Sequence, residues 1–267
     1  SSYVLISLGR QPMALTAAYR YLVLGTIGAT FYLIGVGLLY QATGTLNIAD
    51  LAVRVSELSD SRSVRAAFGF MTVGIGIKLA LFPLHVWLPN AYAYAPSVSS
   101  AFLAATATKV SIYVLIRVFY TIFGPAFSFE TLPLDWVLLP LAIIAMFAGS
   151  VIAIFEVDVK RMLAYSSVAQ IGYIILGISL ASVLGLTGGL LHLFNHALMK
   201  GALFLAMGCV FYQLGSVALS DLDGVGRRMP WTMAAFVIGG LSLIGIPLTA
   251  GFVSKLYLLW AALDLGL

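Results

Sequence analysis

Charged side chains are scarce in this sequence of 267 residues. Asp, Glu, Lys and Arg make up 9% of the chain and hydrophobic residues 61%, whereas a soluble domain usually carries roughly a quarter charged residues. This composition excludes an ordinary water-soluble fold, which would have to leave much of its apolar surface in contact with water. The sequence therefore predicts an integral membrane protein.

Cysteine is nearly absent as well, since Cys209 is the only one in the chain. An intramolecular disulfide is thus excluded, and a cysteine-based metal site lacks its partner ligands. The small net charge of +4 is spread over loop-like segments, which indicates membrane topology and argues against nucleic-acid binding. The start, "SSYVLISLG", lacks both an initiator Met and the basic region of a signal peptide. We expect the chain to be a fragment of a longer subunit.

Long apolar runs are what the sequence has in abundance. A bilayer core of about 30 Å takes about 20 helical residues, so these runs predict an all-α, polytopic transmembrane helix bundle of about seven spans. The predicted spans are approximately 20–40, 66–88, 98–120, 136–155, 163–184, 186–212 and 231–262.

Two of these spans are interrupted. "LFPLH" (81–85) contains Pro83, which cannot donate a hydrogen bond within a helix, and "GIPLTAG" (245–251) breaks the last span. Broken helices at membrane depth are tolerated only where neighbours or water satisfy the freed backbone groups. Each break has a lysine nearby, as expected for a carrier built from repeats. Two ordinary proline kinks are the alternative.

Lysine and arginine are distributed differently. All nine arginines lie at span ends or in loops, whereas four of the five lysines fall inside apolar spans, namely Lys78, Lys109, Lys200 and Lys255. Arg stays protonated, while Lys gives up its proton readily when desolvated. A charge at the bilayer centre costs about 2.5–3.5 kcal/mol, so these lysines must face a hydrated interior, be neutral part of the time, or have counter-charges. Lys255 has a further alternative, which is to snorkel toward the interface.

Acidic side chains are missing from the spans. None of the ten Asp and Glu residues lies in the middle of one. A lysine that exchanges protons inside a membrane normally needs a carboxylate nearby. We therefore expect this partner to come from a segment outside this chain or from a neighbouring subunit.

The histidines strengthen the case for proton chemistry. "HLFNHALMK" places His192, His196 and Lys200 at i, i+4 and i+8, and these positions share one helix face. Histidine titrates near neutral pH and passes protons between its two nitrogens, so this stripe is typical of a section of proton wire. Packing histidines are the alternative. A zinc site lacks a third ligand, and we predict no metal. His85 is either an accessory proton site or a cap for the break at Pro83.

The same residues carry a resemblance to a known family. "KLALFPLHVWLPNAYAYAPSVSSAFLAATATKVSIYVLIR" (78–117) looks like the central motif of the antiporter-like membrane subunits of respiratory complex I, membrane-bound hydrogenases and multisubunit cation/proton antiporters. "KRMLAYSSVAQIGYIILG" (160–177), "HLFNHALMKGALFL" (192–205) and "GIPLTAGFVSKLYLL" (245–259) look like three further family blocks in the expected order. Residues 19–52 are most similar to the D-type subunit of the multisubunit sodium/proton antiporters.

The resemblance implies an antiporter-like fold with two inverted repeats. The chain would cover the end of the first repeat (about 1–123) and most of the second (about 124–267). The matching residues would form a chain of proton sites along the membrane midplane, namely Lys78, Lys109, His192, His196, Lys200 and Lys255. The family also has a glutamate paired with the lysine that matches Lys78, and its position would fall just upstream of Ser1.

The resulting hypothesis is a proton-translocating subunit of a multisubunit monovalent cation/proton antiporter in the cell's inner (plasma) membrane. Its expected partners are other membrane subunits of a hetero-oligomeric complex, the lipid bilayer, protons and, as an open alternative, sodium. No stretch of the sequence indicates a quinone, flavin or iron–sulfur site. We therefore expect an ion-transport subunit with no cofactor and no redox centre of its own.

Two other functions remain open. The chain is alternatively a proton-pumping membrane subunit of a redox-driven complex, such as NADH:quinone oxidoreductase or a membrane-bound hydrogenase, and then part of a translocase. It is otherwise a structural membrane scaffold, whose lysines only bind lipid phosphates or partner subunits.

Overall fold

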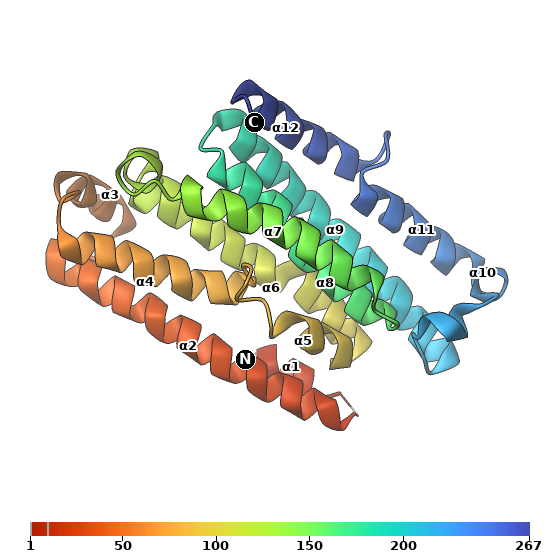
Figure 1. The fold of residues 1–267 in the computed structure, drawn as a ribbon. Coiled ribbons are helices and arrows are strands. Elements are labelled where there is room, and N and C mark those ends of the chain that lie inside the picture. The colour runs from red at the N-terminus through yellow and green to blue at the C-terminus, as the bar shows by residue number, and fades with distance from the viewer. Residues whose placement is uncertain (1, 10) are drawn as a thin grey trace.

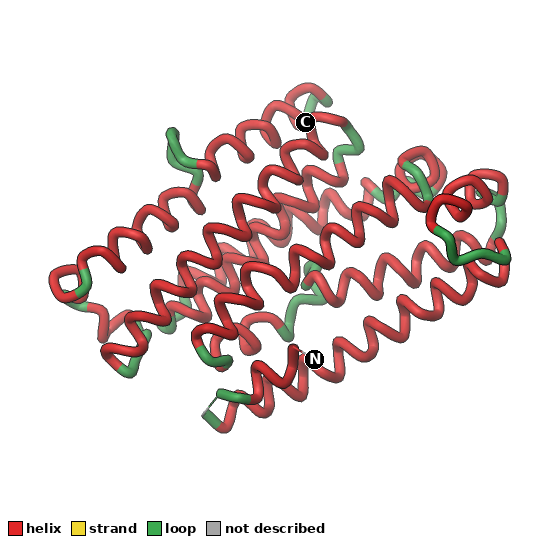
Figure 2. Tube along the Cα trace, turned by 180° about the vertical axis from the view of Figure 1, so that it is seen from behind, coloured by secondary structure: helices red, strands yellow, loops and turns green. Residues whose placement is uncertain are grey.

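The protein is described here by a computed structural model that covers residues 2–9 and 11–267. Helices dominate this part of the chain, in which no β-strand occurs, only an isolated bridge between Asp158 and Ala218. The long helices run side by side in a bundle when viewed from either side (Figures 1 and 2). The structure confirms the predicted all-α bundle.

Five helices of the described residues are long and apolar enough to cross a membrane: α2, α6 with its extension η1, α7, α8 and α9. Of the two remaining predicted spans, 66–88 covers most of α4 and the break that follows it and ends where α5 begins, and 231–262 covers α11 and most of α12. In chain order the elements are α1 (Ser2–Ser7), α2 (Pro12–Thr43), α3 (Ile48–Glu57), α4 (Arg62–Leu79), α5 (Leu88–Tyr94), α6 (Ser97–Arg117), η1 (Val118–Ile122), η2 (Ala126–Thr131), α7 (Asp135–Ile154), α8 (Val159–Ser179), α9 (Val183–Leu214), η3 (Leu219–Leu222), α10 (Val225–Arg228), α11 (Pro230–Ile244) and α12 (Ala250–Asp264).

Helix α9 organises the second half of the bundle. It packs against α6, α8, α11 and α12, and α8 packs in turn against α7. Figure 1 shows α9 running along the bundle beside these helices. Because these neighbours cover its inner face, the polar side chains on that face are buried.

Helices α2 and α4 form a second close pair, which meets at two glycines. A Cβ atom at Gly74 would lie 2.6 Å from the carbonyl oxygen of Gly28, and one at Gly28 would lie 2.9 Å from the carbonyl oxygen of Gly74. Small residues at such crossings let membrane helices approach closely. The contact brings the end of α4, with Lys78 one turn beyond Gly74, against the side of α2.

The first break separates α4 from α5. Helix α4 ends at Leu79, and Ala80 takes a left-handed conformation with φ of 61°. The amide of Leu81 donates to the carbonyl of Gly76 (2.9 Å). The Trp87 indole donates to the carbonyl of Ile77 (2.8 Å). Neighbouring groups thus satisfy carbonyls that the break frees, as membrane depth requires. The chain is non-helical from Ala80 to Trp87, so this feature is an interruption and not a simple kink.

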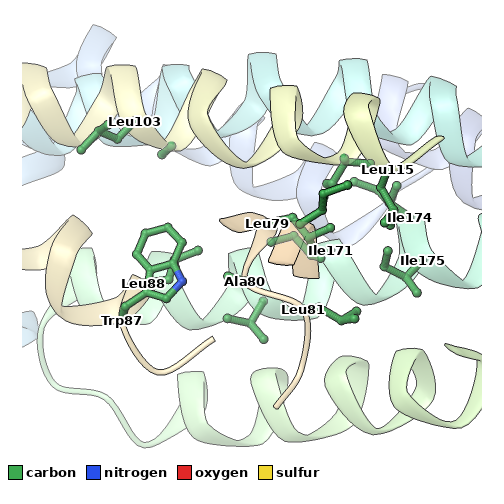
Figure 3. Packing of buried hydrophobic residues seen from close by; sticks show 14 of the residues in the cluster. Leu79, Ala80, Leu81, Trp87, Leu88, Leu103, Leu115, Ile171, Ile174 and Ile175 are labelled. Atoms are coloured by element: carbon green, nitrogen blue, oxygen red, sulfur yellow. The ribbon is translucent and has the colours of Figure 1, made fainter. Parts of the chain in front are cut away.

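Apolar packing holds the first break in place. Leu79, Ala80 and Leu81 lie between α6 and α8 (Figure 3), where Leu115 and Ile171 are among the surrounding side chains. All five residues are buried. The position of Lys78 is therefore fixed by the packing of the turn that follows it.

The second break separates α11 from α12. Gly245 ends α11 with φ of 91°. The Lys255 amine donates to the last carbonyls of this helix, those of Leu243 and Ile244, at 3.0 Å each. A cation is favourable at the C-terminal end of a helix, where carbonyls lack partners. Lys255 therefore points into the break.

The α12 side of this break depends on a glycine. A Cβ atom at Gly251 would lie 1.8 Å from the carbonyl oxygen of Ser242. We expect Gly251→Ala to force α11 and α12 apart at a cost of about 1–3 kcal/mol or more, and so to lower the melting temperature of the purified complex. Gly240→Ala is the matched control, because open space surrounds that position on α11. Equal melting temperatures for the two variants would contradict this contact.

Candidate functional site

The polar face of α9 is completely buried. His192, His196 and Lys200 each have 0% exposure. The two imidazole rings are stacked, with centroids 6.2 Å apart and planes 11° from parallel. The structure thus brings together the three groups that the i, i+4, i+8 spacing placed on one face.

His192 is held on both sides of its ring. Its Nε2 lies 2.8 Å from Oε1 of Gln170 on α8. Its Nδ1 lies 2.9 Å from the Oγ of Ser254 on α12. The Tyr173 ring on α8 is also close, with its centroid 5.7 Å from that of His192. Two neighbouring helices, α8 and α12, therefore fix the orientation of this imidazole.

His196 has a different environment. Neither of its ring nitrogens has a hydrogen-bond partner within the described residues, although both atoms are buried. Thr108 on α6 also has a buried hydroxyl oxygen without a partner there. Buried polar groups are normally paired, so the His196 nitrogens and the Thr108 hydroxyl oxygen can each form a further hydrogen bond.

Lys200 ends the stripe. Its amine donates to the carbonyl of Leu163 and to the hydroxyl of Ser166, both on α8 and both at 2.6 Å. These acceptors are neutral. A full charge in such a site lacks the counter-charge that normally offsets its desolvation.

Lys109 enters the same interior from α6 and is 7% exposed. A Cβ atom at Gly201 on α9 would lie 3.5 Å from that of Ala105. Helices α6 and α9 run antiparallel. Lys109, four residues after Ala105, therefore lies level with Ala197, which is four residues before Gly201 and next to His196. Its amine donates to the carbonyl of Ala104 and so lies near the level of Lys200.

Lys255 borders this interior from α12. Its amine, bound to the α11 carbonyls, lies 4.5 Å from the centre of the Tyr173 ring. Tyr173 in turn contacts His192. Lys255 follows Ser254, which contacts the same imidazole. The second broken helix is therefore joined to the α9 stripe by two side chains.

Lys78 lies apart from this cluster. It is half-buried, its amine is 5.4 Å from the centre of the Tyr21 ring on α2, and it borders a cavity of about 590 Å³. Across this cavity lie α6 residues that include Thr106 and Ser111. The amine makes no hydrogen bond or ion pair within the described residues. The cavity thus separates Lys78 from the helix that carries Lys109.

His85 lies within the first break and outside the α9 cluster. Its ring stacks on Phe82, with centroids 5.1 Å apart, and its Nδ1 is buried without a partner in the described part of the chain. The backbone carbonyl of His85 accepts a hydrogen bond from the amide of Leu88 at the start of α5. The backbone carbonyl of His85 thus supports the end of the break, and its ring packs against Phe82 within it.

The ion pairs reinforce the difference between lysine and arginine. Within the described residues the salt bridges are Arg54–Asp50, Arg65–Asp60 and Arg161–Glu156, each with a shortest distance of 2.9 Å. All three involve arginine and lie at helix ends. Near Asp50, the hydrogen bond from Arg54 lowers the pKa of the carboxyl group. No lysine has a carboxylate partner in this part of the molecule.

Several polar residues of this site were not predicted from the sequence. Gln170, Tyr173 and Ser166 lie on α8, in the stretch 162–199 that lacks charged residues, and Ser254 lies on α12. A polar side chain every three or four residues along an otherwise apolar helix was the signal available on α8. Ser254, next to Lys255, offered none of its own.

Together these features define a class of protein: a multi-pass membrane protein with two interrupted helices and a buried row of amines and imidazoles between them. The whole sequence, residues 1–267, matches the family described as "NADH:quinone oxidoreductase/Mrp antiporter, TM". The chain belongs to this family. This match confirms the resemblance to the antiporter-like membrane subunits that the sequence motifs indicated.

Relatives include components of two kinds of complex. The chain is 49% identical to the N-type subunit of NADH-quinone oxidoreductase from Desulforudis audaxviator over 100% of the chain and 52% of that protein. It is 36% identical to the D-type subunit of the Na(+)/H(+) antiporter from Alkalihalophilus pseudofirmus over 98% of the chain and 52% of that protein. The chain thus spans about half the length of the curated relatives it matches.

Solved structures share the fold. A chain of the Mrp complex from Dietzia sp. superposes with a TM-score of 0.91 and 35% identity over 99% of this chain and 49% of that chain. A chain of respiratory complex I from Thermus thermophilus superposes with a TM-score of 0.80 and 29% identity over 100% of this chain and 56% of that chain. The similarity therefore extends across the whole bundle.

Proposed function

We propose that this chain carries protons through the membrane as part of a larger ion-translocating complex. The observation that carries this proposal is the buried row of basic groups formed by His192, His196 and Lys200, with Lys109 and Lys255 at its sides. Neutral oxygens and aromatic rings surround these groups, and no carboxylate pairs with their amines in the described part of the chain. Groups of this kind at membrane depth are typical of proton relays.

The physical basis is a balance between two forms of each amine. Desolvation disfavours a charged amine, whereas a nearby opposite charge favours it. In our proposal Lys78 changes its protonation state as a carboxylate from another segment approaches or withdraws. The proton then passes by way of Lys109 and the α9 stripe toward Lys255.

A monovalent cation/proton antiporter is the first proposed host. The similarity to the D-type subunit of the Na(+)/H(+) antiporter and to a chain of the Mrp complex supports this choice. In this host the partners are other membrane subunits of the same assembly, and the transported ions are protons and sodium. An antiporter carries out no redox chemistry, so in this host the chain acts as an ion-transport subunit.

A redox-driven pump is the second proposed host. The 49% identity to the N-type subunit of NADH-quinone oxidoreductase supports it. In that host the same row of groups carries protons, while electron transfer takes place in other subunits. The chain then contributes proton movement to a translocase and has no redox centre of its own.

Inverted membrane vesicles that contain the complete complex separate the two hosts. In the antiporter, added sodium dissipates an imposed pH gradient; in the redox-driven pump, the electron donor NADH creates one. A pH-sensitive dye records both responses, and mass spectrometry of the purified complex identifies the accompanying subunits. If the vesicles show neither response, the proposal of proton translocation is contradicted.

Lys109→Ala tests proton translocation against the scaffold alternative. We expect the complex to assemble normally, because the only hydrogen bond of the Lys109 amine within the described residues goes to a carbonyl of its own helix, that of Ala104. We expect proton flux to fall by about 100-fold, as for the loss of a positioned proton-transfer group. Flux in vesicles and the yield of intact complex are measured together. Loss of assembly with normal flux per complex would instead favour a scaffold.

A further inference from the structure

The Ser254 hydroxyl is the starting point, because its one hydrogen has two acceptors within reach. The Oγ lies 2.9 Å from Nδ1 of His192 and 3.0 Å from the carbonyl oxygen of Gly251. A hydroxyl donates one hydrogen bond and accepts others. Its hydrogen can therefore point to only one of these two acceptors at a time.

With the hydrogen directed at His192, the imidazole is neutral. Nδ1 then accepts from Ser254, and the hydrogen on Nε2 is donated to Oε1 of Gln170, at 2.8 Å. Both ring nitrogens have partners in this arrangement. The Gly251 carbonyl keeps its place as an acceptor within α12.

With the hydrogen directed at Gly251, the same site fits a protonated imidazole. Nδ1–H now donates to the Ser254 oxygen, and Nε2–H still donates to Gln170. All polar atoms remain paired, and the two arrangements differ by one proton on Nδ1 and by the rotation of one hydroxyl group. Leaving a buried charged donor unpaired would cost far more than this rotation.

His196 provides the contrast. Its ring is as deeply buried as that of His192, but neither of its nitrogens has a partner among the described residues. A proton added there would leave two buried N–H groups without acceptors from these residues. Of the two stacked rings, His192 is therefore the one that is built to hold a charge.

The groups that face His192 support the same conclusion. They are Gln170 and Tyr173 on α8, His196 on α9, and Ser254 with its neighbour Lys255 on α12. Lys109 on α6 lies one turn further along. All are neutral or basic, so the oxygens of Ser254 and Gln170 are what stabilise a charge on this ring.

We propose that Ser254 and Gln170 are positioning residues that let His192 bind and release a proton at Nδ1 without leaving any buried polar group unpaired. This inference rests on the proposed proton translocation. In the step, an N–H bond forms at Nδ1, the ring gains one positive charge, and a protonated amine or water on the Lys255 side loses the proton. The Ser254 hydrogen turns to the Gly251 carbonyl, and no bond between heavy atoms changes.

The test compares Ser254→Ala with Gln170→Glu, because the two changes act in opposite directions. Without the Ser254 oxygen, a protonated Nδ1 has no acceptor, so the proton affinity of His192 falls by about tenfold or more. A glutamate at position 170 would place a carboxylate against Nε2–H and keep the ring charged to higher pH. Ser242→Ala is the matched control. Ser242 lies at the same break and its hydroxyl accepts a hydrogen bond from the Gly251 amide, but within the described residues it makes no hydrogen bond with His192.

The measurement is solid-state ¹⁵N NMR of the histidine-labelled complex in lipid, recorded from low to high pH. The His192 resonance is assigned by its loss in His192→Asn. Compared with the unmodified protein, we expect the imidazolium signal of His192 to disappear at lower pH in Ser254→Ala and at higher pH in Gln170→Glu. In Ser242→Ala we expect it to disappear at the same pH. Proton flux is measured on the same preparations, and we expect it to fall in both of the first two variants.

The failure of this inference is distinct from the failure of the proposed function. Unchanged His192 titration in both Ser254→Ala and Gln170→Glu would overturn the role of these residues, whatever the flux. Equal shifts of the His192 signal in Ser254→Ala and Ser242→Ala would also overturn the role proposed for Ser254. Proton translocation itself is tested by the lysine variants, whose outcome does not depend on the state of His192.

Discussion

Lys78→Ala is expected to abolish ion-driven proton translocation while the complex assembles normally. The amine borders a cavity of about 590 Å³ and makes no hydrogen bond or ion pair within the described residues. Its removal therefore costs little packing and leaves no buried acceptor unpaired. If Lys78 is the switching group, flux should fall by at least about 100-fold, as for other essential proton-transfer groups.

Two controls give this prediction its meaning. Lys78→Arg keeps a positive charge that stays protonated at all working pH values, so it should assemble and still fail to translocate protons. Ser111→Ala changes another residue that lines the same cavity and should keep its flux. Normal proton flux in vesicles that contain Lys78→Ala would refute the proposed switch.

Lys200→Met is expected to have opposite effects on transport and on stability. Methionine has a similar length, so it fills the site of a side chain that is 0% exposed. The Leu163 carbonyl keeps the hydroxyl donors of Ser166 and Ser167, each at 3.0 Å. Replacing a buried ion pair by well-packed apolar residues is often stabilising, by about 1–4 kcal/mol, and Lys200 has only neutral acceptors to offset the desolvation of its amine. We therefore expect a higher melting temperature together with lost proton flux.

Lys200→Ala separates charge from packing in this experiment. It removes the same amine but leaves a cavity, which typically costs about 2–5 kcal/mol at a buried site. We expect both variants to lose flux, whereas only the alanine variant should melt at a lower temperature. Thermal unfolding of the purified complex and flux in vesicles provide the two readouts. A methionine variant that retains flux would show that Lys200 is dispensable for proton movement.

Local patterns in the sequence were enough to predict much of this molecule. The apolar runs predicted the helices, and Pro83 with the "GIPLTAG" stretch predicted the two interruptions. The spacing of His192, His196 and Lys200 predicted that they share a face. These features depend on residues close together in the chain, where helix geometry is fixed.

Contacts between distant segments could not be predicted in the same way. His192 is oriented by Gln170 and Ser254, residues 22 and 62 positions away. The Lys255 amine binds the last carbonyls of α11, and the sequence alone does not show that this helix ends at Ile244. Such partners depend on how the helices pack, for which the sequence of each helix contains little information.

Lys160 illustrates the same limit. It lies in the connection between the predicted spans 136–155 and 163–184, yet it is 5% exposed, and its amine donates to the Ser97 hydroxyl at 2.9 Å. The segment after α9 covers it, held by the hydrogen bond from the amide of Val159 to the carbonyl of Val217. A connection between two spans is therefore not always a water-exposed position.

The stripe along α9 has an electrical consequence. His192 and Lys200 are eight residues apart, which corresponds to about 12 Å along the helix axis. In a hydrocarbon layer of about 30 Å, a proton that moves between them along an upright α9 crosses about 40% of the transmembrane voltage. At about 2.3 kcal/mol per charge for 100 mV, this step alone does work of about 1 kcal/mol with or against the field. If protons follow the proposed route along this stripe in an upright α9, part of that route is sensitive to membrane potential.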